Sequence, residues 1–282
     1  MKIFKKITDL SAYLEIQKKS GKQIGFIPTM GALHNGHLKL LQTSIDHNDF
    51  TVVSIFVNPT QFNNTKDFER YPITIENDIL QLEKHHADLL FLPEVNEMYP
   101  EGTEDQPNIA LGRVESGLEG FFRPGHFQGV ATIVKKLLEA VRPDFLYMGQ
   151  KDFQQCMVVA KLLQLMRLPA TLEIVPTLRE ESGLAMSSRN MLLSEEGRKK
   201  AAAIFAALQH VKDNILNAPV EQLKEEAKKI MTDAGFSKIE YLELCKADDL
   251  SPTENFEKGQ KAVIITAAYL EGVRLIDNLL IN

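Results

Sequence analysis

The chain has 282 residues, of which 44% are hydrophobic and 25% charged, and 32 lysines and arginines against 38 aspartates and glutamates leave a net charge of −6. These fractions are typical of globular proteins and exclude a disordered, collagen-like or disulfide-scaffold chain. The acidic balance also argues against a protein that mainly coats nucleic acid, since neutralising phosphates needs a cationic surface, although a local cationic pocket remains compatible with it.

The two cysteines, Cys156 and Cys245, lie far apart and form no CxxC pair. We expect two reduced, buried thiols in a reducing compartment and no structural zinc, which needs four close ligands. Residues 1–6 precede no long apolar segment, and no apolar run approaches the roughly 20 residues of a membrane span. We therefore expect a cytoplasmic protein with no membrane partner and no nucleic-acid partner.

The first part of the chain alternates short apolar runs with helical patterns. The expected strands are 23–28, 51–57, 88–92, 145–148 and 171–175, and the expected helices are 37–47, 74–86, 127–141 and 152–166. The apolar runs are rich in β-branched residues and too short to be helices. Strands that are buried on both faces and alternate with helices indicate an α/β fold with a doubly wound parallel sheet.

The pattern changes after residue 176, where a loop rich in serine, glycine and charge begins. The expected helices that follow span 194–214 and 220–234, and the expected strands span 239–245 and 262–270, with a turn at Glu271-Gly272. Helices followed by separate strands indicate a small α+β domain. We therefore divide the chain into two domains, 1–176 and 177–282.

The segment with the most chemical content is 28–37, Pro-Thr-Met-Gly-Ala-Leu-His-Asn-Gly-His, between the first expected strand and helix. Open α/β sheets bind ligands at this edge, and a helix N-terminus offers unpaired N–H groups to an anion. His34 and His37 are three residues apart, so on a helical turn both rings face one side and can donate hydrogen bonds to phosphate. The alternatives are a surface histidine pair, or two metal ligands for which no third ligand is evident nearby.

Two later segments also suit phosphate binding. Gly149-Gln-Lys-Asp152 follows an expected strand and opens a helix, and Lys151 supplies a compact, movable charge there. The alternative is a solvated lysine paired with Asp152. The segment 186–190, Met-Ser-Ser-Arg-Asn, carries two hydroxyls and a guanidinium that suit gripping a triphosphate as domains close. From the residues alone, an ordinary surface loop is an equal alternative.

Five ordered blocks of the chain resemble one family. His34-Asn-Gly-His37 matches the His-x-Gly-His signature of the adenylyl-transferring superfamily, which includes the class I aminoacyl-tRNA synthetases. The sequence around it and four later blocks resemble the pantoate–β-alanine ligase family more narrowly. The blocks are 28–37, 56–62, 123–130, 149–155 and 176–190.

The resemblance implies a Rossmann-like nucleotidyltransferase domain that binds nucleotide and pantoate, with the smaller C-terminal domain closing over the ATP site. It implies an ATP-dependent ligase that condenses (R)-pantoate with β-alanine, with Mg²⁺ as cofactor, in the biosynthesis of a coenzyme A precursor. Pantoyl adenylate would be the intermediate, and pantothenate, AMP and pyrophosphate the products. The resemblance also implies a homodimer.

The resemblance assigns roles to matching positions of this sequence. The expected catalytic residues are His34, His37, Lys151 and Arg189. The expected ATP-binding residues are Met30, Gly31, Ala32, Leu33, His34, Asn35, Gly36, His37, Gly149, Gln150, Lys151, Asp152, Leu178, Met186, Ser187, Ser188 and Arg189.

Other matching positions concern the two acids. Gln61 and Gln155 are expected to bind pantoate, and Gln61 also borders the β-alanine site, whereas from the residues alone either is a surface glutamine. Asn58 and Arg123 are possible substrate-site residues. Asp78 is a possible magnesium ligand, with a surface charge as the alternative.

The chain departs from the family pattern at three positions, and each departure is a single side chain. Ile73 stands where arginine is common, Ser182 where aspartate is common, and Gln150 where glutamate is common. None of these positions removes a phosphate-binding group. Two other functions remain open from the residues: a nucleotidyltransferase that retains the phosphoester, and a non-catalytic nucleotide sensor.

Overall fold

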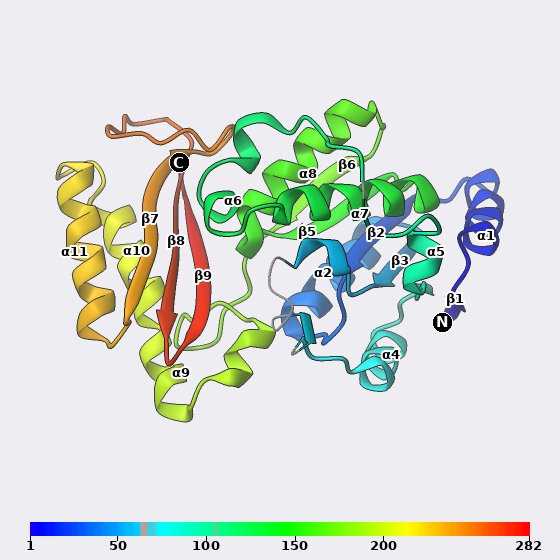
Figure 1. Ribbon diagram of the computed structural model, residues 1–282, viewed down its shortest axis with the longest axis horizontal. Helices are drawn as coiled ribbons and strands as arrows, with labels where there is room; N and C mark the ends of the chain where they lie inside the picture. The colour runs from blue at the N-terminus through cyan, green and yellow to red at the C-terminus, as the bar shows by residue number, and fades with distance from the viewer. Residues whose placement is uncertain (63–67, 70, 105) are drawn as a thin grey trace. The chain divides into compact units, whose positions relative to one another are not determined.

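Six parallel strands form the first sheet of the protein, in the order β1-β4-β3-β2-β5-β6. Figure 1 labels all of these strands except β4. The computed structural model describes residues 1–62, 68–69, 71–104 and 106–282. It divides the chain into two units. The first comprises Met1–Leu111, Arg123–Gly149 and Val158–Pro176, and the second comprises Gly112–Phe122, Gln150–Met157 and Thr177–Asn282. These units are not continuous in sequence, and the predicted division into domains 1–176 and 177–282 stays a prediction.

The first unit contains the parallel sheet and most of the helices that connect its strands. The strands are β1 (Lys2–Phe4), β2 (Ile24–Thr29), β3 (Phe50–Ile55), β4 (Leu89–Phe91), β5 (Phe145–Gly149) and β6 (Thr171–Val175). The helices are α1 (Ile7–Lys19), α2 (Asn35–His47), α4 (Ile75–Lys84), α5 (Val95–Met98) and α7 (His126–Val141), and the short 3-10 turn η1 is Pro59–Gln61. Helix α8 (Phe153–Met166) begins in the second unit and belongs to the first from Val158 onward.

The sheet is covered by helices on both faces, as its apolar strands require. On one face, Ile27 of β2 and Val53 of β3 pack with Leu41 of α2 and Leu82 of α4. Successive side chains of a strand point to opposite faces, so the neighbouring buried residues belong to the other face, where α7 contacts β2 and α1. The structure therefore confirms the doubly wound α/β fold.

Several described elements of the first unit were not predicted from the sequence: β1, α1 and the short α5 and η1. β1 has only three residues, fewer than the period-2 pattern needs to be recognised. α1 buries only Leu10 and Leu14, so its apolar stripe is narrow. Its ends carry the charges that suit a helix dipole, Asp9 in the first turn and Lys18 and Lys19 in the last.

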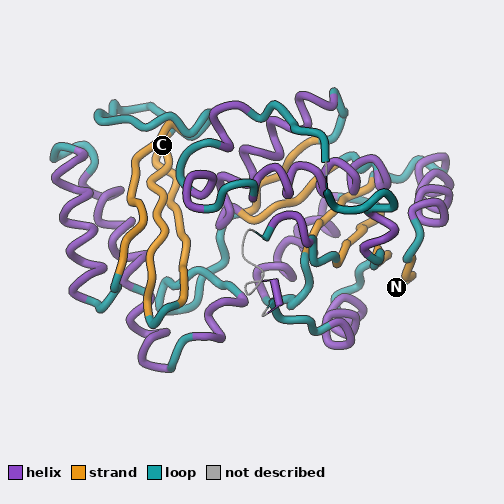
Figure 2. The backbone as a smooth tube through the Cα atoms, in the orientation of Figure 1, coloured by secondary structure: helices purple, strands orange, loops and turns teal. Residues whose placement is uncertain are grey.

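The second unit is built on a three-stranded antiparallel sheet in the order β7-β8-β9 (Figure 2). The strands are β7 (Lys238–Lys246), β8 (Ala262–Leu270) and β9 (Val273–Ile281). The helices are α6 (Glu119–Phe122), α9 (Glu195–Ala201), α10 (Ala203–Asn214) and α11 (Val220–Asp233), with the 3-10 turns η2 (Gly112–Glu115), η3 (Gln150–Asp152) and η4 (Ser188–Leu192).

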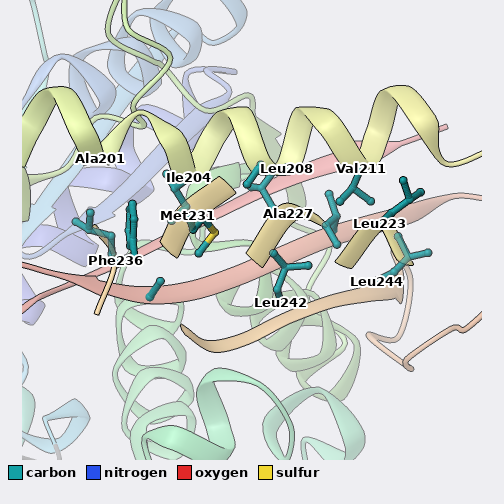
Figure 3. Close-up of a cluster of buried hydrophobic side chains, with 14 of the residues drawn as sticks. Ala201, Ile204, Leu208, Val211, Leu223, Ala227, Met231, Phe236, Leu242 and Leu244 are labelled. Carbon is teal, nitrogen blue, oxygen red and sulfur yellow. The ribbon is translucent and has the colours of Figure 1, made fainter. Parts of the chain in front are cut away.

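Both faces of the second sheet are buried. On one face Leu208 of α10 and Ala227 of α11 pack against Leu242 and Leu244 of β7 (Figure 3). On the other face, Tyr241 of β7 and Val263 of β8 pack with Phe122 of α6 and Phe153 at the start of α8. The apolar character of β8 on both sides follows from this double coverage.

In this unit the structure differs from the sequence prediction at α6, which was not expected, in the helix over 194–214 and at β9. The helix expected over 194–214 is two helices, because the N–H of Ala202 bonds to the carbonyl of Lys199, three residues back, and interrupts the α-helical pattern. β9 was not predicted, although the turn before it was. Glu271 and Gly272 both have positive φ, +50° and +76°, as the two central residues of a tight hairpin turn require.

Among the residues that the structure describes, none of the helices combines the length and apolarity that a membrane span requires. Cys156 and Cys245 are free thiols and fully buried, as expected.

Burial raises the pKa of both thiols above the ordinary value of 9.0, that of Cys245 to about 12. We expect a disulfide reagent such as DTNB to label neither cysteine of the native protein at pH 8 and to label both in denaturant. Unfolded thiols ionise first as the pH rises above 9, so the unfolded state then binds fewer protons and the free energy of unfolding falls. Rapid labelling of the native protein would contradict this prediction.

Candidate active site

β2 and β5 are neighbours in the first sheet and mark the point where its strand order reverses. The chain leaves β2 for β3 and β4 on one side and returns to β5 on the other. Open α/β sheets bind ligands at this point, outside the carboxyl ends of the strands. β2 ends at Thr29 and β5 ends at Gly149. The loop 30–34, which follows β2, is therefore the first candidate for a ligand site in this unit.

Two imidazoles close the N-terminus of α2. The main-chain N–H of Gly36 donates to Nδ1 of His34 at 3.1 Å, and the main-chain N–H of His34 donates to Nδ1 of His37 at 3.3 Å. A nitrogen that accepts a hydrogen bond carries no proton, so each neutral ring holds its proton on Nε2. The ring centroids lie 4.1 Å apart. The N-cap and first turn of α2 thus bring two imidazoles together, each with its proton on Nε2.

Gly36 makes this arrangement possible because it has no side chain. A Cβ at position 36 would lie 2.8 Å from Cε1 and 2.9 Å from Nδ1 of His34, closer than such contacts occur. Any other residue would therefore displace the imidazole from the backbone N–H that orients it. The glycine of this motif is explained by close packing against His34.

The loop that precedes the imidazoles is held by a buried carboxylate, that of Asp78 on α4. Oδ2 of Asp78 accepts the N–H of Ala32 at 2.9 Å, and Oδ1 accepts the N–H of Leu33 at 2.8 Å and the hydroxyl of Thr74 at 3.1 Å. Ala32 has a φ of +49°, a conformation that costs a non-glycine residue about 1 kcal/mol or more. Asp78 is fully buried, so it is a loop-stabilising carboxylate and not a surface charge.

A second cluster of the first unit surrounds Asn58 and Gln61, both buried. The Asn58 amide donates to Oε1 of Gln61 at 3.3 Å and to the carbonyl of Gly129 at 3.1 Å. Its Oδ1 accepts the hydroxyl of Tyr99 at 2.8 Å. Nε2 of Gln61 lies 2.7 Å from Sδ of Met30, in the loop after β2. Asn58 therefore fixes the side chain of Gln61, and Tyr99 fixes Asn58.

Arg123 and His126 extend this cluster. Nε2 of His126 lies 3.1 Å from the Arg123 guanidinium, which can only donate, so the proton of this ring is on Nδ1. Nδ1 of His126 then donates to the main-chain carbonyl of Gln61 at 2.8 Å. His126 begins α7, as predicted, and it also connects Arg123 to Gln61.

The approach of α7 to η1 depends on Gly129. A Cβ at this position would lie 2.7 Å from Cα of Gln61 and 2.6 Å from the main-chain carbon of Thr60. Backbone atoms cannot move aside as a flexible side chain does. The absence of a side chain at 129 therefore lets Asn58 reach the carbonyl of α7 and keeps Gln61 in place.

In the second unit, Lys151 lies in η3 with its ammonium 3.5 Å from the Asp152 carboxylate. Only 17% of the Lys151 side chain is exposed, and its pairing with Asp152 is the one named in the alternative, so the role of Lys151 stays a prediction. The main-chain carbonyls of Gln150 and Lys151 each accept a hydrogen bond at 2.9 Å from the amide of Asn278 on β9. η3 is thereby attached to an edge strand.

The adjacent glutamines of α8 differ in their surroundings. Gln154 is buried and its amide is used entirely by the segment 112–122: it accepts the N–H of Glu119 at 3.0 Å and donates to the carbonyls of Val114 and Gly117. Gln155 is half-buried. Of the pair, Gln155 is therefore the residue open to a ligand role.

The serine- and arginine-rich loop of the second unit is tied down by its neighbours. Oγ of Ser187 accepts the N–H of Arg189 at 3.2 Å and starts η4. The Asn190 amide donates to the carbonyl of Ala185 at 3.0 Å and to Glu180 at 3.2 Å, and Glu180 also pairs with Arg198 of α9. These bonds hold the backbone that carries Ser187, Ser188 and Arg189.

Arg179 connects this loop to β9. Its guanidinium forms two hydrogen bonds with the Asp277 carboxylate, 2.6 and 2.9 Å, and donates to the carbonyls of Gly183 and Asn278. Burial raises the pKa of the Asp277 carboxyl, and the Arg179 charge opposes that rise. The ion pair is well shielded, since Asp277 is only 1% exposed.

Residues that hold these candidates in place and were not predicted from the sequence include Tyr99, Arg179, Asp277 and Asn278. Arg179 lies inside the block 176–190, and this position was the only indication in the sequence that it could matter for the site. Tyr99, Asp277 and Asn278 lie outside every motif, and their partners are 41, 98 and 128 positions away in the chain. No local pattern reveals contacts of that range.

Comparison with known proteins identifies the relatives of this chain. The family model described as pantoate-beta-alanine ligase matches residues 2–280. A pantothenate synthetase of Cytophaga hutchinsonii is 42% identical over 98% of this chain and 97% of its own. The crystal structure of pantothenate synthetase from Thermus thermophilus has a TM-score of 0.90 at 38% identity, covering 99% of both chains. That of pantoate-beta-alanine ligase from Francisella tularensis, complexed with "Beta-gamma ATP" and beta-alanine, has a TM-score of 0.79 at 36% identity, over 99% of this chain and 97% of the other.

We expect Asp78→Asn to lower the free energy of unfolding by about 1–3 kcal/mol, because an amide NH₂ would face a main-chain N–H of the loop. Urea denaturation measures the change. Asp46→Asn is the matched control: Asp46 is exposed on α2 and should change the free energy by no more than about 0.5 kcal/mol. Equal effects of the two substitutions would contradict the role of Asp78.

We also expect the neutral rings of His34 and His37 to be Nε2–H tautomers. Long-range ¹H–¹⁵N spectra of protein labelled on histidine should show, for both, a protonated Nε2 and an unprotonated Nδ1. Single His→Ala variants assign the two spin systems among the 7 histidines of the chain. A protonated Nδ1 on either neutral ring would contradict the hydrogen bonds at the start of α2.

Proposed function

This chain belongs to the pantoate-beta-alanine ligase family, and on that premise we propose which of its residues carry each part of the reaction. The enzyme condenses pantoate with β-alanine at the expense of ATP and forms pantothenate, AMP and pyrophosphate. The family match covers nearly the whole chain, and no large part of the relatives is missing from it.

We infer that the reaction has two steps. A carboxylate oxygen of pantoate attacks the α-phosphorus of ATP, the bond to pyrophosphate breaks, and pantoyl adenylate forms. The neutral amine of β-alanine then attacks the acyl carbon, the bond to AMP breaks, and the amine proton leaves to solvent. Activation is needed because direct attack on a carboxylate would have to expel oxide, whereas AMP is a good leaving group.

The observation that carries the proposal is the pair of Nε2–H donors of His34 and His37 at the start of α2. ATP and pantoate are both anions and repel each other, so the first step needs groups that stabilise the charge growing on pyrophosphate. Donors already oriented by the backbone cost no reorganisation when the reaction occurs. The partial positive charge of the helix N-terminus acts in the same sense.

For the rest of the ATP site, we propose the residues expected from the sequence. The loop Met30–His37 follows β2, and Gly149 ends the neighbouring β5, which supports a nucleotide at the switch point. Gln150, Lys151 and Asp152 follow Gly149 directly in the chain. Lys151 and Arg189 are the catalytic cations of the proposal, and Leu178, Met186, Ser187 and Ser188 complete the set.

For the two acids, we propose Gln61 and Gln155 as pantoate ligands, with Gln61 also bordering β-alanine. A glutamine amide both donates and accepts, which suits a ligand with hydroxyls and a carboxylate. Asn58 supports this role of Gln61 by holding its Oε1. Arg123 supplies a guanidinium to the same cluster, and we propose that it lies near a substrate carboxylate.

We propose that Mg²⁺ enters with ATP, bound to its phosphates, as this ion usually is in such enzymes. Within the described residues, no three His, Cys, Asp or Glu side chains gather as a metal site. The role of Asp78 as a ligand stays a prediction, and its carboxylate already accepts three hydrogen bonds. The homodimer and the cytoplasmic location also stay predictions.

Exchange of labelled pyrophosphate into ATP tests the first step, because it requires pantoate and no amine. We expect His37→Ala and Lys151→Ala each to lower the exchange rate by about 10²–10³-fold, the scale for one preorganised donor. His47→Ala, at the exposed end of the same helix, is the control and should stay within about twofold.

Mass spectrometry of the products, with each substrate omitted in turn, tests the second step. Pantothenate should form only when ATP, pantoate and β-alanine are all present. Exchange that proceeds without pantoate, or a product that retains the phosphoester, would instead indicate a nucleotidyltransferase. Exchange rates of both alanine variants within a few-fold of the parent would remove His37 and Lys151 from the proposed machinery.

A further inference from the structure

Asn278 lies on β9, which pairs with β8 along one edge only. Its side chain is fully buried, although asparagine is a polar residue that sheets seldom favour. Both N–H groups of its amide donate at 2.9 Å, one to the carbonyl of Gln150 and one to that of Lys151. Its Oδ1 accepts the side-chain amide of Gln150 at 3.2 Å. The side-chain hydrogen bonds of Asn278 are thus directed to η3, the segment that carries Lys151.

The preceding residue, Asp277, holds the other cationic segment of this unit. Its carboxylate binds both terminal nitrogens of Arg179, and Oδ1 also accepts the main-chain N–H of Asn278 at 2.7 Å. Arg179 in turn donates to the carbonyl of Gly183 in the loop that leads to Ser187 and Arg189. Two successive residues of one strand therefore anchor the backbone of both segments.

Sheet stability alone gives little reason for a polar residue at this buried position. A buried amide contributes little net stability over an apolar residue of similar shape, because its hydrogen bonds replace those it made with water. The bonds of Asn278 do, however, determine where two consecutive carbonyls of η3 lie. A displacement of about 1 Å at a positioning group can cost on the order of 10²-fold in rate.

We propose that Asn278 is a positioning residue for the adenylation step, which fixes the main chain of Lys151 so that its ammonium meets the phosphates of ATP. The inference rests on the proposed function and extends it to a residue outside every recognised motif. Asn278 does not touch substrate in this role and acts through the position of Lys151.

Asn278→Asp tests the proposal with almost no change of shape. It removes both donors and turns an oxygen toward the carbonyls of Gln150 and Lys151. Thr266→Val is the matched control: Thr266 is fully buried on β8, opposite Asp277, and its hydroxyl donates to the carbonyl of Tyr241 at 2.7 Å, away from η3. Both variants lose buried hydrogen bonds in the same sheet, and thermal denaturation measures the stability that each loses.

We expect Asn278→Asp to lower kcat for pantoate-dependent exchange by about 10–100-fold, whereas Thr266→Val stays within about twofold. In a Lys151→Ala background, we expect Asn278→Asp to lower kcat further by less than about twofold, because the ammonium that Asn278 positions is already absent. A merely structural residue would lower the rate by the same factor in both backgrounds. Should Asn278→Asp fail to fold, Asn278→Ser, which keeps one donor, is assayed in the same two backgrounds.

The outcomes separate the two levels of the argument. If the parent enzyme shows no pantoate-dependent exchange, the proposed function fails. If the parent shows the exchange, two results overturn the positioning role of Asn278 and leave the proposed function standing. One is an exchange rate of Asn278→Asp like that of Thr266→Val, and the other is an equal fold decrease caused by Asn278→Asp with and without Lys151.

Discussion

The hydrogen bonds between backbone N–H groups and the two imidazoles at the start of α2 are the interaction on which the proposed phosphate-binding role of this helix depends. A helix leaves its first N–H groups without partners, and side chains usually satisfy them. Here the capping side chains are His34 and His37 themselves. Folding of the helix and orientation of the two Nε2–H donors are therefore one event, and Gly36 is needed because a side chain would occupy the space of the ring.

Buried polar side chains extend the same principle to the other segments. Asp78 binds the N–H groups of the loop before α2, Asn58 holds the amide of Gln61, and Asn278 holds the carbonyls around Lys151. In each case a group that would be costly to bury alone is satisfied by the backbone or side chain of a functional segment. The two units share this design although one is built on a parallel sheet and the other on an antiparallel one.

The departures from the family pattern are accommodated locally. Ser182 stands where aspartate is common, and its Oγ still accepts the N–H of Leu184 in the turn, at 3.4 Å. Gln150 stands where glutamate is common, and its amide donates to Asn278, which a carboxylate does not do. Ile73, where arginine is common, is 71% exposed. These substitutions do not affect the four proposed catalytic residues, His34, His37, Lys151 and Arg189. Their presence agrees with the membership of this chain in the family.

The sequence by itself determined the fold class of the first unit, most of its helices and strands, and the motif residues, because apolar periodicity and short motifs are local signals. It also determined the family, through five ordered blocks. Only the tertiary structure decided which polar residues support them. Tyr99, Asp277 and Asn278 bond to partners far away in the chain, β9 carries little local signal of its own, and the break at Ala202 depends on a single hydrogen bond. Contacts of that kind exist only once the chain has folded, so no reading of neighbours in sequence reveals them.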